Sequence, residues 1–557
     1  MSMDYTPKLA QAEQLLARRD FGAAMAVYDS IIAVDPKCAD VFLAKAQAFA
    51  SCQQYKEAIT TYSQFLVLRP TSVPALLARA QARFNIGDEE RAFEDFDLAA
   101  ALDPDAKYAP GMALHLAMRI CRWADFVLSA TDLSARVDAG EPVMLPHPFM
   151  MMSGSARLHR KCAEIFYHDR CGAKTAARPV TARAKKIRLG YFSMDFSEHA
   201  VSHLCGGLLR AHDRARFEVT AFTFADNPFD PMRKRIASSV DHFVNVERRT
   251  PAEVAALARE RQIDIAVDMN VHLWSQPAVF ANGAAPIQVN YLGYPGTVGA
   301  DTHDYIIGDR IVTPLAHAEH FSERLVALPH TYLPTDFHRF EPLHTPTREA
   351  LGLPERGFVF CCFNECQKFT PDVFSIWMRL LKDVDGSVLW LRSSNAPAMR
   401  NLRAEAEKQG VAGSRLVFAQ HMPFQDYLSR HRVADLFLDT FPFNAHTTAS
   451  DALWGGLPVL TKMEAAFPGR VGASLLTTAG IPELITYTAE EYEQRARELA
   501  SNPETLAQIK KRLADNRMKC PLFDTTRYTR NIERAYEQMM ERYRAGLPPD
   551  HITVVGL

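Results

Sequence analysis

Hydrophobic and small residues in the first part of the chain recur with a fixed spacing of 34 residues. Three kinds of residue keep this spacing: prolines (Pro36, Pro70 and Pro104), alanines (Ala24, Ala58 and Ala92) and aromatic residues (Tyr28, Tyr62 and Phe96). Small residues let two helices approach closely, an aromatic ring fills the gap to the next pair, and a proline ends the second helix. The pattern predicts a stack of helix–turn–helix units.

A helix–turn–helix unit of this length resembles the tetratricopeptide repeat. We expect roughly three repeats over residues 5–136, the last of them degenerate around 108–130. Such stacks usually bind a peptide along a concave face, so we expect a protein or peptide partner. Two alternatives stay open: a short array that only caps the next domain, or one that forms a homodimer.

From residue 187 onward the pattern changes to short apolar runs that alternate with helix-like segments. The first series of runs covers 187–196, 217–224, 263–269, 286–293 and 304–310, and the second covers 357–364, 387–393, 415–419, 435–440 and 458–461. This alternation predicts parallel sheets with helices on both faces. Two such lobes in tandem leave a cleft at the carboxyl ends of their strands.

These changes in pattern divide the chain into four segments. We expect tetratricopeptide repeats at 5–136, a connector at 137–184, a first lobe at 185–345 and a second lobe at 346–545 that ends in a long helix. The predicted fold class is an all-α repeat array followed by two doubly wound, Rossmann-like α/β lobes.

Composition narrows the possible partners and location. The chain has 557 residues, 48% of them hydrophobic, and a formal net charge of -2. This composition argues against global disorder, and the charge gives no electrostatic case for nucleic acid or an anionic membrane as the main partner. No apolar run approaches the length of a membrane span, no secretory signal is visible at the start, and the ten cysteines contain no CxxC pair. We therefore expect a cytoplasmic protein.

One cysteine and histidine pattern looks at first like a zinc site. His159 and Cys162 form an HxxC pair, and His168 and Cys171 form another nine positions later. The segment between them reads as helix, and at about 100° per residue the second pair faces roughly the opposite way. A continuous helix cannot bring both pairs to one ion, so we expect no metal.

The stretch 444–456 collects short hydrogen-bonding side chains where a helix should begin. The first amides of a helix lack partners within it, and its positive end favours an anion. Thr447 and Thr448 add hydroxyls, His446 adds a further donor, and Asp451 lies one turn in, where it suits a ribose hydroxyl. The cluster suits a diphosphate, although ordinary capping of the helix by threonine is the alternative.

Two further candidates follow predicted strands. Lys368 comes just past an apolar strand, where its ammonium group would neutralise charge on a departing phosphate; a surface lysine is the alternative. His199 comes just beyond the first strand of the first lobe, where it would bind a sugar or accept a proton; a helix cap is the alternative. The glycine-rich loop at 292–301 lacks GxGxxG, which gives little support to a bound dinucleotide.

Four motifs, taken together with the repeats, resemble the O-linked N-acetylglucosamine transferase / SPINDLY family. They are LGYPGT at 292–297, FNECQK at 363–368, NAHTT at 444–448 with the Asp and Trp that follow, and PLFD at 521–524. The resemblance implies a GT-B fold and an inverting transfer of sugar, most readily from UDP-GlcNAc, to serine or threonine of a protein. It implies no metal and no cofactor beyond the nucleotide sugar.

By the same resemblance, each candidate residue takes a family role. Lys368 and the 446–448 helix start would hold the donor diphosphate, Asp451 the ribose, and His199 the cleft position once proposed as the base and now often seen as a sugar-positioning group.

The chain departs from the family at several positions. Glu365 stands where the family usually has Gln or Asn beside the phosphate, and a carboxylate there repels a diphosphate unless it turns away. Phe424 and Tyr427 replace a lysine and a histidine of the animal enzymes, and Tyr427 would stack on a base. Segments 271–277 and 282–286 also differ. These changes leave open GDP-fucose as donor, flagellin or surface-protein glycosylation with another sugar, and a non-catalytic repeat scaffold.

Overall fold

The chain forms two compact units, residues 1–133 and 134–557. In the computed structural model, the described residues are 4–172, 176–180, 184–273, 277–336 and 345–556.

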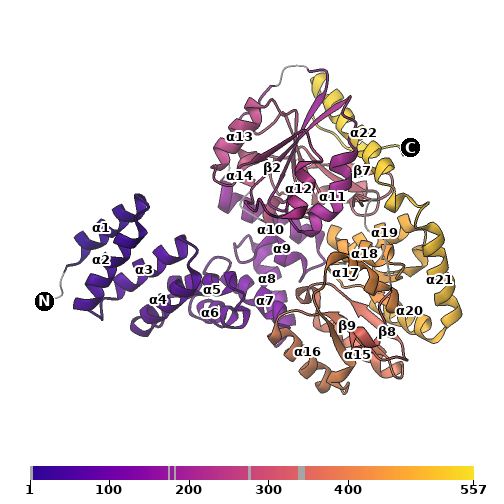
Figure 1. Ribbon diagram of the computed structural model, residues 1–557, viewed down its shortest axis with the longest axis horizontal. Helices are drawn as coiled ribbons and strands as arrows, with labels where there is room; N and C mark the ends of the chain where they lie inside the picture. Colours follow the sequence, from indigo (N-terminus) through magenta and orange to yellow (C-terminus); the bar gives the residue numbers. More distant parts are fainter. Residues whose placement is uncertain (1–3, 173–175, 181–183, 274–276, 337–344, 557) are drawn as a thin grey trace. The chain divides into compact units, whose positions relative to one another are not determined.

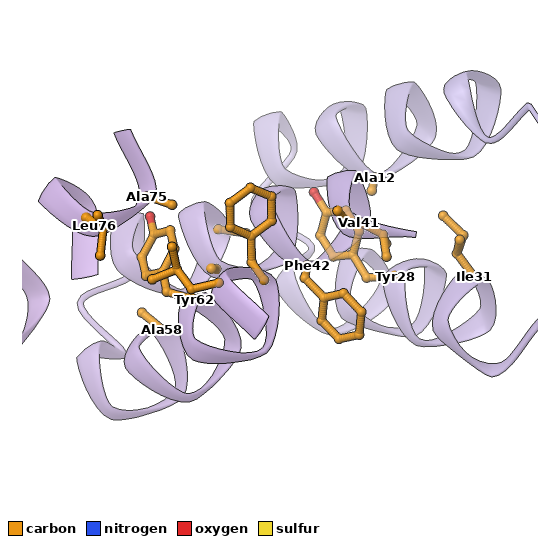
Figure 2. Packing of buried hydrophobic residues seen from close by; sticks show 14 of the residues in the cluster. Ala12, Tyr28, Ile31, Val41, Phe42, Ala58, Tyr62, Ala75 and Leu76 are labelled. Atoms are coloured by element: carbon orange, nitrogen blue, oxygen red, sulfur yellow. The ribbon is translucent and has the colours of Figure 1, made fainter. Parts of the chain in front are cut away.

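The first unit is a run of antiparallel helices with short turns, which confirms the predicted helical array. Its helices are α1 Thr6–Ala17, α2 Phe21–Val34, α3 Ala39–Ser51, α4 Tyr55–Leu68, α5 Val73–Asn85, α6 Glu89–Leu102 and α7 Ala109–Arg119; α8 Phe126–Ala139 runs across the boundary between the units. The recurring alanines and aromatic residues are all buried, as Figure 2 shows for Tyr28, Ala58 and Tyr62. The 34-residue period therefore marks the core positions where successive helices meet.

In the second unit, α8 is followed by a five-residue helix, α9 Pro146–Met150, and a 16-residue helix, α10 Ala156–Cys171. The helix α10 is continuous, so His159 and Cys162 lie on its buried side while His168 is exposed. The ring of His159 donates to the carbonyl of Ser153 at 2.7 Å, and the thiol of Cys162 donates to that of Met144 at 3.3 Å. Within the described ranges, no group of three or more His, Cys, Asp or Glu side chains is placed to hold a metal ion.

The first lobe is built on a parallel sheet that has eight strands among the described residues, in the order β14-β7-β6-β5-β4-β1-β2-β3. The strands are β1 Ile187–Ser193, β2 Phe217–Thr223, β3 His242–Asn245, β4 Ile265–Asp268, β5 Ile287–Asn290, β6 Tyr305–Asp309, β7 Arg324–Leu328 and β14 Ile552–Thr553. Helices α11 Ala200–Ala211, α12 Pro231–Ala237, α13 Pro251–Glu260 and α14 Pro277–Ala281 belong to this lobe (Figure 1). The predicted runs correspond to β1, β2, β4, β5 and β6, whereas β3, β7 and β14 were not predicted.

The second lobe is built on a parallel sheet with the order β10-β9-β8-β11-β12-β13. Its strands are β8 Val359–Cys362, β9 Val388–Arg392, β10 Leu416–Ala419, β11 Leu436–Leu438, β12 Val459–Lys462 and β13 Ile485–Thr486. Its helices are α15 Pro371–Asp383, α16 Ala396–Lys408, α17 Phe424–Arg430, α18 Thr447–Trp454, α19 Val471–Ala479, α20 Ala489–Ser501 and α21 Pro503–Asn516. Because β8 lies between β9 and β11, the carboxyl ends of these three strands are neighbours.

The long terminal helix α22, Thr525–Arg544, packs on the first lobe, although the sequence placed it with the second (Figure 1). It contacts α11, β5 and β7. The hydroxyl of Tyr528 donates to the carbonyl of Tyr332 at 2.5 Å, and Glu533 forms an ion pair with Arg216 at 2.8 Å. The helix therefore ties the end of the chain to the first sheet, whose edge the strand β14 extends.

None of the helices in the described part of the chain combines the length and apolar character that crossing a membrane requires.

Candidate functional site

The helix α18 begins without a side-chain cap. Residue 446 precedes it in a non-helical conformation, and no side chain at that position accepts from the first amides. Thr447 and Thr448 line a cavity, and the hydroxyl of Thr448 donates to Oδ1 of Asn364 at 2.5 Å. An uncapped helix start that opens on a cavity is an anion-binding arrangement, because the amides and the helix dipole both favour negative charge.

The cavity has a volume of about 570 Å³ and lies between the two lobes. Its size falls within the usual range for sites that bind small molecules. The first lobe contributes Glu198, His199 and His203, and the second contributes Phe363, Arg392, Phe424, Tyr427, Arg430, Thr447, Thr448 and Asp451. Five of the predicted residues thus meet at one cavity. Lys368, His446 and Glu365 are not among its lining residues, and each is held by its own contacts nearby.

Lys368 is half-buried at the carboxyl end of β8. Its ammonium group donates to the carbonyl of Asn444 at 3.0 Å and lies 4.3 Å from the ring centre of Phe443. Burial lowers the pKa of Lys368 to about 8, and the negative charge of Asp439 opposes that shift. A poorly hydrated ammonium group next to the loop that leads into α18 is well suited to stabilise a phosphate.

Asp439, which the sequence analysis missed, organises that loop. Its buried carboxylate accepts from the amides of Thr440 at 2.8 Å and Ala445 at 2.6 Å, and from the hydroxyl of Thr461 at 2.6 Å. Burial raises the pKa of Asp439 above its ordinary value, and the hydrogen bond from Thr461 opposes the rise. A carboxylate at the end of the apolar run 435–440 was the available signal.

The N–H group of His446, which the sequence analysis expected to donate to a ligand, is already used within the protein. Its Nε2 donates to the carbonyl of Pro468 at 3.2 Å, and the ring stacks on Phe443 at 4.8 Å. Burial, reinforced by the charge of Lys368, holds the pKa of His446 well below its usual value, so the ring is neutral. A neutral ring that donates through Nε2 presents Nδ1 as an acceptor, which corrects the expectation of a further donor.

Asp451 and Tyr427 form a polar pair on the cavity wall. The phenol of Tyr427 is hydrogen-bonded to the carboxylate of Asp451, and burial raises the pKa of Tyr427 well above its usual value. The neutral phenol therefore donates. The ring of Tyr427 stacks with Phe424 at 6.0 Å, and Phe424 stacks with His203 of the first lobe at 4.0 Å. This row of rings offers flat apolar faces next to a carboxylate.

His199 caps a helix and also lines the cavity. Its Nδ1 accepts from the amide of Val201, the second residue of α11, at 3.3 Å, so the helix-cap alternative is realised. Nδ1 also lies 3.6 Å from Oδ2 of Asp195, which accepts from the side-chain amide of Asn270 at 2.6 Å. Because Nδ1 accepts from this amide it carries no hydrogen, so the hydrogen of the ring is on Nε2, which acts as a donor.

Glu365 forms an ion pair with Arg392, a cavity residue that the sequence analysis did not select. The carboxylate is therefore paired with a positive charge. Arg430, also not selected, lies over the ring of Phe363 at 4.0 Å and over that of Tyr427 at 4.5 Å. Neither arginine follows from local pattern, because their places depend on how strands β8 and β9 and helix α17 are packed.

The fold and the cavity define a class of protein. Two parallel-sheet lobes with a ligand-sized cavity between them form the GT-B arrangement. The model of Glycosyl transferase family 41 matches residues 167–346 and 341–532. The chain belongs to glycosyl transferase family 41, which confirms the resemblance inferred from the motifs.

Similar proteins agree with this membership. The chain is 36% identical to the probable UDP-N-acetylglucosamine–peptide N-acetylglucosaminyltransferase SEC of Arabidopsis thaliana, over 67% of the chain and 39% of that protein. It is 26% identical to the UDP-N-acetylglucosamine–peptide N-acetylglucosaminyltransferase of Caenorhabditis elegans, over 78% of the chain and 49% of that protein. The chain thus spans less than half the length of these curated relatives.

A solved structure extends the likeness over nearly the whole chain. A lysine-to-methionine mutant of the O-GlcNAc transferase of Thermobaculum terrenum superimposes with a TM-score of 0.70 and 26% identity. The match covers 97% of this chain and 98% of that one.

Proposed function

We propose that this chain is an inverting, metal-independent glycosyltransferase that moves N-acetylglucosamine from UDP-GlcNAc to serine or threonine hydroxyls of protein acceptors. Membership of glycosyl transferase family 41 and the activities for which its relatives are named support the reaction class. The single observation that carries the proposal is the uncapped start of α18, whose threonines line a cavity shared by both lobes.

In the proposed mechanism the acceptor oxygen attacks the anomeric carbon from the face opposite the diphosphate. The bond from that carbon to the diphosphate oxygen breaks, its electron pair leaves with the nucleotide, and the proton of the acceptor hydroxyl passes to a phosphate oxygen of the departing diphosphate. Lys368 and the amides at the start of α18 stabilise the charge that develops on the leaving group, which is the task of a metal ion in many other transferases. Asp451 accepts from a ribose hydroxyl, and Tyr427 presents its ring to the base.

His199 takes a positioning part in this mechanism. Because its Nδ1 accepts from the amide of Val201, the ring donates from Nε2. That hydrogen is available to an oxygen of the sugar, and the geometry favours this role over that of general base.

The acceptor and the domain roles complete the proposal. The repeats at 5–136 recruit the acceptor protein, residues 137–184 connect the repeats to the lobes, and the two lobes hold the two substrates, with α22 counted as part of the first lobe. Self-association of the repeats into a homodimer is a separate use of the same array.

Calorimetric titration with UDP and GDP, followed by a transfer assay with UDP-GlcNAc read by mass spectrometry, tests the proposal. UDP binding with transfer of N-acetylglucosamine supports it, and activity that survives EDTA supports the absence of a metal. GDP binding would redirect the assignment to fucose. A chain that binds neither nucleotide would be a repeat scaffold, and the proposal would be wrong.

A further inference from the structure

The ion pair between Glu365 and Arg392 joins the carboxyl ends of two neighbouring strands. Arg392 is the last residue of β9, and Glu365 lies three residues beyond the end of β8; the two strands pair directly, with Cys362 opposite Leu391. Both side chains are close to half exposed, at 43% for Glu365 and 48% for Arg392. Arg392 lines the cavity that also receives the start of α18.

Arg392 is more available to a ligand than Arg430, the other arginine that lines the cavity. Arg430 is buried, donates to the carbonyl of Gln420 at 3.3 Å and lies against aromatic rings, so its position is fixed by the core. Arg392 is held by a half-exposed carboxylate. Exposed ion pairs contribute little to stability and exchange partners readily, whereas a guanidinium binds phosphate through two parallel hydrogen bonds.

Glu365 is the counterpart in this pair. Its backbone carbonyl accepts from the amide of Lys368 at 3.0 Å, so the two residues lie within one helical turn of each other. Its negative charge acts on Lys368 electrostatically. The same charge opposes an arriving diphosphate and competes with it for Arg392.

We propose that Arg392 is a further donor-binding residue that contacts the diphosphate, and that Glu365 competes with the diphosphate for it and thereby weakens nucleotide binding. The inference rests on the proposed function, because it concerns the same nucleoside diphosphate. It gives Glu365, the residue that departs from the family pattern, a part in releasing the product nucleotide.

The dissociation constants of UDP and of uridine, measured calorimetrically on the full chain, test this. Arg392→Gln should weaken UDP binding by about tenfold or more, because one charge-assisted contact is lost, and leave uridine binding unchanged. Arg392→Lys should recover part of the loss. Glu365→Gln should tighten UDP binding several-fold, and this gain should shrink when Arg392→Gln is also present.

A matched control comes from a distant ion pair. Arg379→Gln breaks an exposed pair with Glu493 in α15 and α20 and should leave UDP binding unchanged. Equal UDP affinity of Arg392→Gln and the unmodified chain, or equal losses for UDP and uridine, would overturn the inference and leave the proposed function intact. If the unmodified chain binds neither UDP nor GDP, the proposed function fails and the inference fails with it.

Discussion

The two lobes contribute different chemistry to the same cavity. The second lobe supplies Arg392, Arg430 and the amides at the start of α18, all groups that favour an anion. The first lobe supplies the connection between β1 and α11, with Glu198 and His199. Both lobes are built on parallel sheets, so this difference comes from the residues at the strand ends and not from the fold.

The contrast indicates a division of labour. We propose that the second lobe holds the nucleotide, which carries the negative charge, and that the first lobe faces the transferred sugar and the incoming hydroxyl. Substitutions in the second lobe should therefore change UDP affinity or the departure of UDP, whereas substitutions in the first lobe should change transfer while UDP affinity stays the same.

The largest effect is expected for Lys368→Met. Transfer should fall by about 10²–10³, the usual loss when a group that stabilises developing charge is removed. Thermal stability should change little for two reasons. The contacts of the half-buried ammonium group only partly replace its lost hydration, so removing the charge costs little, and the methionine keeps the packing against Phe443. Turnover with UDP-GlcNAc and the unfolding midpoint are the measurements.

Lys510→Met is the matched control for that lysine. The ammonium group of Lys510 also donates to a backbone carbonyl, that of Ala434 at 3.2 Å, but Lys510 does not belong to the site. It should keep full activity. If Lys368→Met also kept full activity, the proposal that Lys368 of the second lobe stabilises the leaving group would be wrong.

A smaller effect is expected in the first lobe, for His199→Ala. The turnover number should fall by about 10-fold to 100-fold, the value of a hydrogen bond to a group that gains charge, and the dissociation constant of UDP should stay within about twofold. His199→Gln should restore part of the activity because its amide donates from nearly the same place. A matching loss of UDP affinity would contradict the division between the lobes.

Much of the fold could be predicted because buried parallel strands read as continuous apolar runs. The runs at 217–224 and 387–393 became β2 and β9 for this reason. The missed β3 and β14 lie at the two edges of the first sheet, and the exposed ends of β3, His242 and Asn245, give it no apolar run. The terminal helix α22 was assigned to the wrong lobe. The sequence shows that one face of the helix is buried, but it does not show which lobe that face packs against.

The site could be predicted where a residue's role follows from its own element. Thr447 and Thr448 begin a helix, and that fact alone suggested an anion site. The ion pair of Glu365 with Arg392 depends on strand order, which no local pattern encodes. The N–H group of His446 donates to the carbonyl of Pro468, twenty-two positions later. That it is therefore not available to a ligand could not be seen from the local sequence.

The pH dependence of transfer should distinguish free from donor-bound enzyme. The pKa of Lys368 is lowered to about 8, so raising the pH through that value removes the positive charge and kcat/KM should fall. A bound diphosphate favours the ammonium form, so kcat at saturating donor should hold to higher pH. Lys368→Arg, which stays charged, should lose the alkaline fall in kcat/KM. A fall that persists in this variant would assign the titration to another group.

The smallest effect is expected for Thr448→Val. The substitution removes the hydrogen bond to Asn364, at 2.5 Å, while keeping the shape of the side chain and the amide at the start of α18. UDP affinity should fall by about threefold to tenfold, because one hydrogen bond of an organised anion site is lost, and Thr448→Ser should behave like the unmodified chain.

Thr478→Val is the control for the loss of a hydroxyl. The hydroxyl of Thr478 bonds the carbonyl of Ser474 inside α19, so this variant should test stability alone and leave UDP affinity unchanged. The comparison between lobes depends on the pattern across variants: Thr448→Val should act on binding and His199→Ala on turnover. If Thr448→Val instead left UDP affinity intact and slowed turnover as His199→Ala does, the nucleotide would not rest on the helix start, and the second lobe would share the task assigned to the first.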